Sequence, residues 1–296
     1  MRKVTFIFAV TTMALWAGAA SAHMLWINLT DSRAHPPGHI MTSLGFGHTL
    51  PFDDFLAGPQ GTIQIGKYQI VAPDMRTDDL GLPDATYHAP RESPIKCNVT
   101  KGDLGLRKVT LAEGTKKGTY QVLAETVPMF FTQYIDTKGK ERMAAKPIDA
   151  IKDLSSVLAA VKHQSIAKAF FAIGEWTEPK PAGCDLEIIP LTDMSDIHAG
   201  DMVEFMVTFR GKPVNTDSKN IRYLTCASNT FGGPDGFHLG AMVMNGKAGF
   251  RIPTSGQWVA NIFYSETVAD NPELANLKDK CSMVYTAATA FFNVRP

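Results

Sequence analysis

The chain has 296 residues, of which 45% are hydrophobic and 20% are charged, a composition typical of a soluble globular protein. Its 29 basic and 29 acidic side chains give a formal net charge of zero. Because no long basic tract is present, nucleic acid and anionic membranes are excluded as expected partners.

The first 22 residues have the pattern of a cleavable secretory signal. Two basic residues precede an uncharged run over 4–20, and a small-residue A-x-A exit ends at Ala22. The run is short for a membrane-spanning helix, which needs ~20 apolar residues. We therefore expect a signal peptide over 1–22, no membrane insertion after its removal, and a periplasmic or secreted protein that begins at His23.

The four cysteines are far apart and form no C-x-x-C pair. In an exported chain an even number predicts two disulfides with three possible connectivities, and free buried thiols are the alternative. A zinc site is not expected from them, because the closely spaced pairs that such sites favour are missing. They are Cys97, Cys184, Cys226 and Cys281.

Residues 23–143 predict an N-terminal β domain. The apolar run over 24–29 predicts a buried first strand, and 40–44 predicts a second. After a loop-rich stretch, alternation over 120–126 predicts a half-buried strand, and 130–135 continues the same sheet.

Residues 144–183 predict a helical connector. Pro147 can begin a helix, because its missing N–H would have no partner there in any case. Apolar residues then recur over 148–161 at three- and four-residue spacing, which gives one apolar face and a helix of about four turns. His163 is expected to be exposed at the end of this helix.

Residues 184–296 predict a C-terminal Ig-like β-sandwich of roughly seven strands, because alternating apolar segments recur at the spacing of that fold. The strands are predicted over 186–189, 203–209, 221–227, 249–252, 258–264 and 283–294. The whole chain is therefore expected to be mostly β, with two β-sandwich-like domains and a helical connector.

His23 is the first candidate metal ligand. Once the signal is removed, its α-amine and imidazole can chelate one ion, and a second imidazole would complete a T-shaped set of three nitrogens, a histidine brace. Such a set suits Cu(II) or Ni(II), which favour tetragonal nitrogen ligation. The alternative is that a histidine follows the cleavage site by chance.

His48 is the preferred second ligand. It lies on a glycine-flanked segment, where backbone freedom lets a side chain be aimed, and Asp53 and Asp54 follow closely enough for a carboxylate to orient its imidazole. The alternative is a histidine that caps a loop. His88 and His238 could reach the site from distant parts of the sequence, so the candidate metal ligands are His23, His48, His238 and His88.

Several short motifs resemble one family of bacterial periplasmic proteins. The family's domain has no assigned function, and its members are often labelled periplasmic components of nickel or cobalt uptake systems. The motifs are LEIIPL at 186–191, HAGD at 198–201, GKPV at 211–214, GKAGF at 246–250, GQW at 256–258, AHMLW at 22–26, and Gly47-His48 followed by Pro51.

The chain departs from the family pattern at two places. Thr49 and Leu50 separate His48 from Pro51, and Tyr264-Ser265-Glu266 stands where the family often has a histidine after the tryptophan. The resemblance implies a periplasmic protein that captures nickel, cobalt or copper and passes it to an envelope metal transporter.

The sequence lacks the common enzyme signatures: it contains no G-x-S-x-G elbow, Walker loop, Rossmann glycine fingerprint or H-E-x-x-H. A non-enzymatic protein is therefore favoured. Two alternatives stay open: an oxidative copper enzyme that uses the histidine brace, and a metal-free β-sandwich module that binds a partner.

Overall fold

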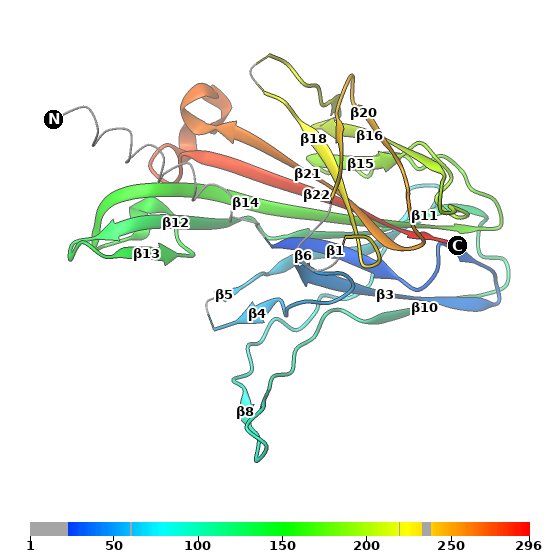
Figure 1. Ribbon diagram of the computed structural model, residues 1–296, viewed down its shortest axis with the longest axis horizontal. Helices are drawn as coiled ribbons and strands as arrows, with labels where there is room; N and C mark the ends of the chain where they lie inside the picture. The colour runs from blue at the N-terminus through cyan, green and yellow to red at the C-terminus, as the bar shows by residue number, and fades with distance from the viewer. Residues whose placement is uncertain (1–22, 60, 219, 233–237) are drawn as a thin grey trace.

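The computed structural model describes residues 23–59, 61–218, 220–232 and 238–296. The predicted signal peptide lies outside the described residues. The described chain is mostly β, as expected, and its main sheets stack in three layers (Figure 1). An 11-stranded sheet lies in the middle, with a three-stranded sheet on one face and a four-stranded sheet on the other.

The central sheet runs in the order β19-β18-β21-β22-β14-β11-β6-β7, with β12 and β2 paired to β14 and with β13 paired to β12. Its strands are β2 (Arg33–Ala34), β6 (Ile65–Val71), β7 (Thr77–Asp79), β11 (Gly118–Thr126), β12 (Met129–Asp136), β13 (Glu141–Ala144), β14 (Leu154–Ile173), β18 (Tyr223–Ser228), β19 (Leu239–Met242), β21 (Gly256–Thr267) and β22 (Met283–Val294).

The outer layers are shorter. The three-stranded sheet has β1 (Met24–Leu29), β3 (Gly38–Gly47) and β10 (Arg107–Leu111), and the four-stranded sheet has β15 (Leu186–Pro190), β16 (Met202–Phe209), β17 (Lys212–Pro213) and β20 (Lys247–Arg251). Two ribbons project from these layers: β4 (Ala57–Gly58) with β5 (Gly61–Thr62), and β8 (Arg91–Glu92) with β9 (Asn98–Val99).

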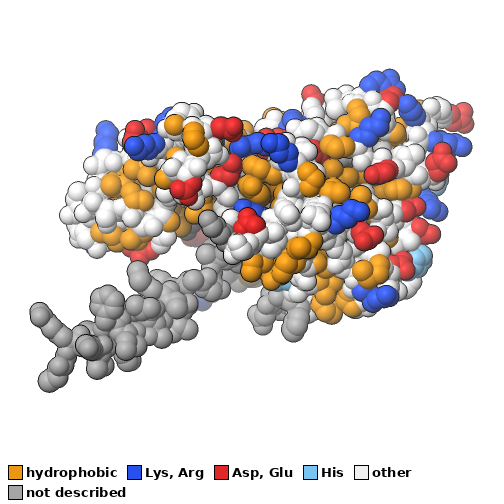
Figure 2. Space-filling model, turned by 90° about the horizontal axis from the view of Figure 1, so that it is seen from above, with side chains coloured by type: hydrophobic (Ala, Val, Ile, Leu, Met, Phe, Trp, Pro, Cys, Tyr) orange, Lys and Arg blue, Asp and Glu red, His pale blue; other side chains and the backbone are white. Residues whose placement is uncertain are grey.

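Helical structure in the described chain is limited to short 3₁₀ turns, namely η1 (Ile148–Ala150), η2 (Val268–Asp270) and η3 (Pro272–Leu277). None of the helices among the described residues has the length and apolar character needed to cross a membrane. On the surface, acidic and basic side chains are interspersed over the face seen in Figure 2, in keeping with the net charge of zero.

Strand β14 shows how the central sheet serves two cores. Ala167, Ala169 and Phe171 belong to the core under β1 and β3, whereas Ile166 and Phe170 belong to the core under the four-stranded sheet. Successive side chains of a strand point to opposite faces. A strand that lies between two other layers therefore carries apolar side chains on both of its faces. For the same reason, the prediction that 120–126 forms a half-buried strand is wrong: β11 is buried on both faces along most of its length.

The predicted helix in the connector is wrong. Apart from the single 3₁₀ turn η1, the stretch is taken by the 20-residue strand β14. The first part of β14 pairs antiparallel with β12, and Val157 and Leu158, assigned to this helical stretch, are 39% and 51% exposed. The three- and four-residue spacing therefore reflects no buried helical face, and pairing with β12 determines the conformation instead.

The same strand joins the two halves of the chain. β14 pairs with β11 on one edge and runs parallel to β22 on the other, with partners from Val161↔Met283 to Ala169↔Phe291. One sheet is thus continuous from the segment predicted as the N-terminal domain to the segment predicted as the C-terminal sandwich. The predicted helical connector is in fact the central strand between them.

The four cysteines are free thiols, so the predicted disulfides are not formed. Cys184 and Cys226 are buried in the core under the four-stranded sheet, Cys281 is buried in a smaller cluster, and Cys97 is exposed near the tip of the β8–β9 ribbon. Burial raises the pKa of the Cys184 thiol to about 12. A buried thiol with a raised pKa behaves as a small apolar side chain and is chemically inert.

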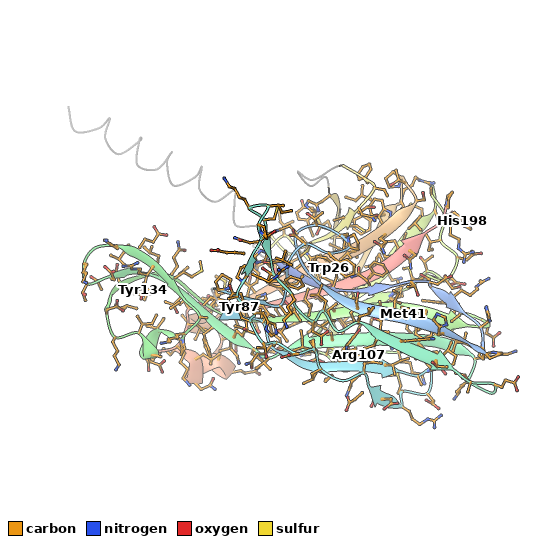
Figure 3. All side chains as sticks on the ribbon, turned by 90° about the horizontal axis from the view of Figure 1, so that it is seen from below. Trp26, Met41, Tyr87, Arg107, Tyr134 and His198 are labelled. Atoms are coloured by element: carbon orange, nitrogen blue, oxygen red, sulfur yellow. The ribbon has the colours of Figure 1, made fainter. Side chains whose placement is uncertain are left out.

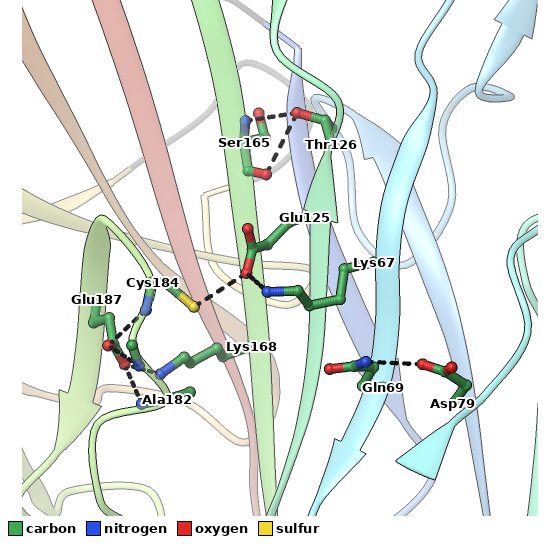
Figure 4. A network of polar contacts seen from close by, with 11 residues as sticks. Lys67, Gln69, Asp79, Glu125, Thr126, Ser165, Lys168, Ala182, Cys184 and Glu187 are labelled. Carbon is green, nitrogen blue, oxygen red and sulfur yellow. Dashed lines mark hydrogen bonds and ion pairs between the residues drawn. The ribbon is translucent and has the colours of Figure 1, made fainter. Parts of the chain in front are cut away.

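A buried ion pair joins the central sheet to β15, the first strand of the C-terminal half of the chain (Figure 4). The Lys168 ammonium on β14 donates to the Glu187 carboxylate on β15, and the two side chains are 1% and 3% exposed. The same carboxylate accepts the backbone N–H groups of Ala182, Gly183 and Cys184 at 2.8–3.0 Å. The Lys168 contact ties the 182–187 segment to the central sheet, and the three backbone contacts fix the conformation of the segment itself.

We expect Lys168→Met to lower the free energy of unfolding by about 3–5 kcal/mol, because it leaves a buried carboxylate without its counter-ion. The matched control is Lys67→Met, which breaks the 2.7 Å pair with Glu125; Lys67 is 41% exposed there. That pair lies nearer the surface, so Lys67→Met should lower the free energy of unfolding by about 1 kcal/mol or less. Urea unfolding measures the free energy for both variants, and equal losses would contradict a larger role for the buried pair.

The prediction that His163 is exposed on a helix is wrong. It lies half-buried on β14, and no hydrogen-bond partner meets its Nε2 among the described residues. The ring borders a cavity of about 90 Å³ that is also lined by Lys162, Asp185 and Arg210. Burial lowers its pKa, because the charged imidazolium would lose its hydration there.

We expect the stability of the protein to fall in mild acid because of His163. Its pKa is lower in the folded chain than its ordinary value of about 6.5, so the unfolded chain binds the proton more readily. The neutral ring makes its full contribution to the free energy of unfolding above pH 6.5. This contribution is lost as the pH falls from there toward the folded pKa, and the free energy of unfolding then changes by at most ~1.4 kcal/mol per pH unit. Urea unfolding at pH 7.5 and 5.5 should show a smaller pH effect in His163→Leu than in the unchanged protein.

Candidate metal site

The candidate site forms where β1 begins and β3 ends. The two strands pair antiparallel, with Met24 opposite Gly47 and Leu25 opposite Phe46. His23 precedes the first of these pairs and His48 follows it, so the register brings the two histidines face to face. Side chains directly opposite each other on antiparallel strands have Cβ atoms about 4.5–5.5 Å apart.

The two imidazole rings are in contact. Their centroids are 4.4 Å apart at an interplanar angle of 48°, and the His23 ring also lies 5.0 Å from the ring of Phe46. With metal–nitrogen bonds of about 2.0–2.1 Å, two imidazoles at adjacent corners around one ion have ring centres roughly 4.4 Å apart, whereas imidazoles on opposite sides are roughly 6.3 Å apart. The observed spacing fits adjacent corners, and the T-shaped brace expected from the sequence would need the rings to turn apart.

The segment that carries His48 is anchored to β1 by buried hydrogen bonds. The carbonyl of Pro51 accepts the indole N–H of Trp26 at 3.2 Å and the amide N–H of Asn28 at 3.0 Å. Figure 3 shows Trp26 in the middle of the molecule, with Tyr134 and His198 toward opposite ends. The loop after His48 is thus fixed by a strand that is buried from Leu25 to Leu29.

Asp53 positions His48 more directly. Its Oδ2 accepts the backbone N–H of His48 at 2.7 Å and lies 3.5 Å from the ring Nδ1. Gly47 makes this possible: its φ is +123°, and an added Cβ would overlap the Asp53 side chain. An outer-shell carboxylate of this kind can orient a metal-binding imidazole, which is the role that the sequence predicts for a carboxylate after His48.

The other candidate ligands lie elsewhere. His88 is half-buried in the loop between β7 and β8, and His238 is exposed just before β19. Over the described ranges, no three histidine, cysteine, aspartate or glutamate side chains are arranged to hold a metal ion. The structure therefore brings together His23 and His48, but not His88 or His238.

Two adjoining cavities open beside the histidine pair. The first, of about 380 Å³, has His23, Phe46 and Phe131 in its wall. The second, of about 400 Å³, is lined in part by Phe52 and Tyr87. The two share Asp54, Phe55, Gly58 and Pro59 as lining residues.

Sequence reasoning did not find the β12 residues at this site. Met129 and Phe131 lie two residues apart on β12, with Phe130 between them, and line the cavity beside His23. Their approach depends on the pairing of β12 with β14, more than 100 residues from His23, and no local signal in the sequence indicates it.

The chain belongs to the family described as Domain of unknown function (DUF4198), whose model matches residues 20–266. This agrees with the expectation of a family without an assigned function. The matched residues include the candidate site and most of the central sheet, but not β22. No curated protein matches this chain.

Solved structures resemble the chain only distantly. A Salmonella alpha-2-macroglobulin mutant is 11% identical with a TM-score of 0.22; the match covers 93% of this chain and 15% of that one. Murine CEACAM1b is 10% identical (TM-score 0.18, 91% and 98% covered), and the fibronectin(III)-like modules of Clostridium thermocellum CbhA are 11% identical (TM-score 0.18, 90% and 94% covered). These scores carry no argument about function, and the chain spans only 15% of the length of the first structure.

We expect Gly45→Ala to destabilise the site. The added methyl group would overlap the indole of Trp26, which would have to move away from Asn28 and Pro51, and overpacking of this kind costs about 1–3 kcal/mol. Gly240→Ala on β19 is the matched control, because nothing lies within 4 Å of a Cβ there. Thermal unfolding of both variants is the measurement, and equal melting temperatures would contradict the assignment.

Proposed function

We propose that the mature chain is a periplasmic transition-metal-binding protein, accessory to the uptake of nickel, cobalt or copper. Its ligands would be the imidazole and α-amine of His23 and the imidazole of His48. The observation that carries this proposal is the β1–β3 register, which sets the two rings 4.4 Å apart.

The donor types favour late first-row metals. Imidazole nitrogen suits nickel and copper, and affinity for nitrogen sites rises from cobalt to nickel to copper. The α-amine exists only if cleavage leaves His23 first, so export and metal binding are coupled in this proposal. The signal-like pattern before His23 and the family match that begins at residue 20 support it.

The surroundings of the pair are suited to capture rather than permanent burial of an ion. The His48 side chain is 42% exposed and Asp53 is 35% exposed, so an ion could enter and leave without unfolding the protein. A site with these features could load in the periplasm and deliver the ion to an envelope transporter.

We expect mature protein that begins at His23 to bind Ni(II), and His23→Ala and His48→Ala each to weaken binding by more than the roughly 10–100-fold that loss of an outer-shell partner costs. Asp53→Asn should fall in that outer-shell range, because Asp53 contacts the ring and the backbone N–H of His48 without being one of the proposed ligands. Isothermal titration calorimetry of the four proteins gives the dissociation constants.

The controls separate the site from unspecific histidine binding. His39→Ala removes an exposed histidine near the far end of β3, roughly 25 Å away along the strand, and should leave the affinity unchanged, as should His88→Ala and His238→Ala. A fusion placed directly before His23 converts the amine to an amide and should weaken binding. N-terminal sequencing of exported protein tests the cleavage site, and a start other than His23, or equal affinity in His23→Ala, would contradict the proposal.

A further inference from the structure

The cavity beside His23 has the size and lining of a small-molecule site. Its volume of about 380 Å³ lies within the range of about 300–1,000 Å³ typical of ligand pockets. Apolar side chains from three parts of the chain face it, namely Phe46 on β3, Phe55 in the loop after His48, and Met129 and Phe131 on β12. Such a lining suits an apolar group rather than a hydrated ion.

The described lining of this cavity includes three polar side chains, those of His23, Asp54 and Thr62. His23 lines the cavity, so an ion held on its imidazole would border the same space. Asp54 contributes the only carboxylate among the described lining residues, and one of its oxygens, Oδ1, accepts the backbone N–H of Phe55 at 2.7 Å. Its second oxygen, for which no hydrogen bond is found within the described part of the chain, could accept from a ligand.

Coordination chemistry requires a further donor at this point. An ion bound by the amine and imidazole of His23 and by the imidazole of His48 has three nitrogen ligands, whereas nickel and copper in tetragonal sites take four or more. The rings fit adjacent corners, which leaves neighbouring positions for a bidentate ligand. The described chain offers no further histidine, cysteine or carboxylate in a metal-binding group there.

We propose that the cavity holds the side chain of a small amino-carboxylate chelator, so that the protein binds a metal together with an apolar α-amino acid. The amine and carboxylate of the chelator would complete the coordination of the ion. Its apolar side chain would lie among Phe46, Met129 and Phe131, and an N–H of its metal-bound amine would donate to Asp54. This inference rests on the proposed metal site and names the form in which the metal is recognised.

The test compares two chelators with the same donor atoms. Ni(II) with L-phenylalanine and Ni(II) with glycine are titrated into the mature protein, and the dissociation constant of each ternary complex is measured. Burial of the benzyl group should make the phenylalanine complex about 10-fold tighter. In Phe131→Ala and, separately, Met129→Ala, this preference should shrink to about 3-fold or less, while the glycine complex is unchanged.

Met143→Ala is the matched control. Met143 lies on β13 beside the same strand but is 73% exposed and does not line the cavity, so this variant should keep the full preference for phenylalanine. Equal affinities for the two chelators in a protein that binds Ni(II) would overturn the inference and leave the metal site standing. Absence of Ni(II) binding in the mature protein would overturn both.

Discussion

The packing of β1 on the central sheet is the constraint on which the candidate site depends. Residues Leu25 to Leu29 are buried, and Trp26 is completely enclosed. Leu25 is also tied to the sheet through its carbonyl, which accepts the hydroxyl of Thr289 on β22 at 2.7 Å. Because β1 cannot slide against β3 without turning its apolar side chains to the opposite face, the register is fixed, and with it the meeting of His23 and His48.

The central sheet determines the rest of the architecture by being apolar on both faces. Alternate residues of β14 enter two different cores, and its parallel pairing with β22 makes the two halves of the chain share one sheet. The buried Lys168–Glu187 pair closes the layer of β15 onto this sheet. A buried pair is seldom the main source of stability, but here the carboxylate also satisfies three backbone N–H groups of the 182–184 segment.

The site combines a firmly anchored His48 loop with cavities that are open to solvent. Trp26 and Asn28 hold the carbonyl of Pro51, and Asp53 holds the backbone of His48, so the His48 loop is ordered by buried groups. The two cavities and the exposed aromatic side chains Phe52 and Tyr87 lie on the solvent side. Fixed donors beside an accessible apolar space are the arrangement expected of a site that recognises a small ligand and releases it again.

Much of the β structure could be read from the sequence. Apolar runs and alternation located β1, β16, β21 and β22 because two-residue periodicity reports the faces of a strand directly. The nomination of His23 and His48 also came from the sequence, through the signal-like segment and the glycine before His48. The approach of His23 to His48, by contrast, is set by the pairing of β1 with β3, two strands that are separated by a loop. The approach of Phe131 to the site is set by the pairing of β12 with β14, much further along the chain.

The sequence by itself determined that the chain is mostly β, where several of its strands lie, and which histidines to test. Only the tertiary structure decided that 154–173 is a strand and not a helix, that the cysteines stay unpaired, and which histidines meet. The physical reason is that strand pairing and two-sided burial depend on partners distant in the chain, whereas composition, spacing and local turns act over only a few residues.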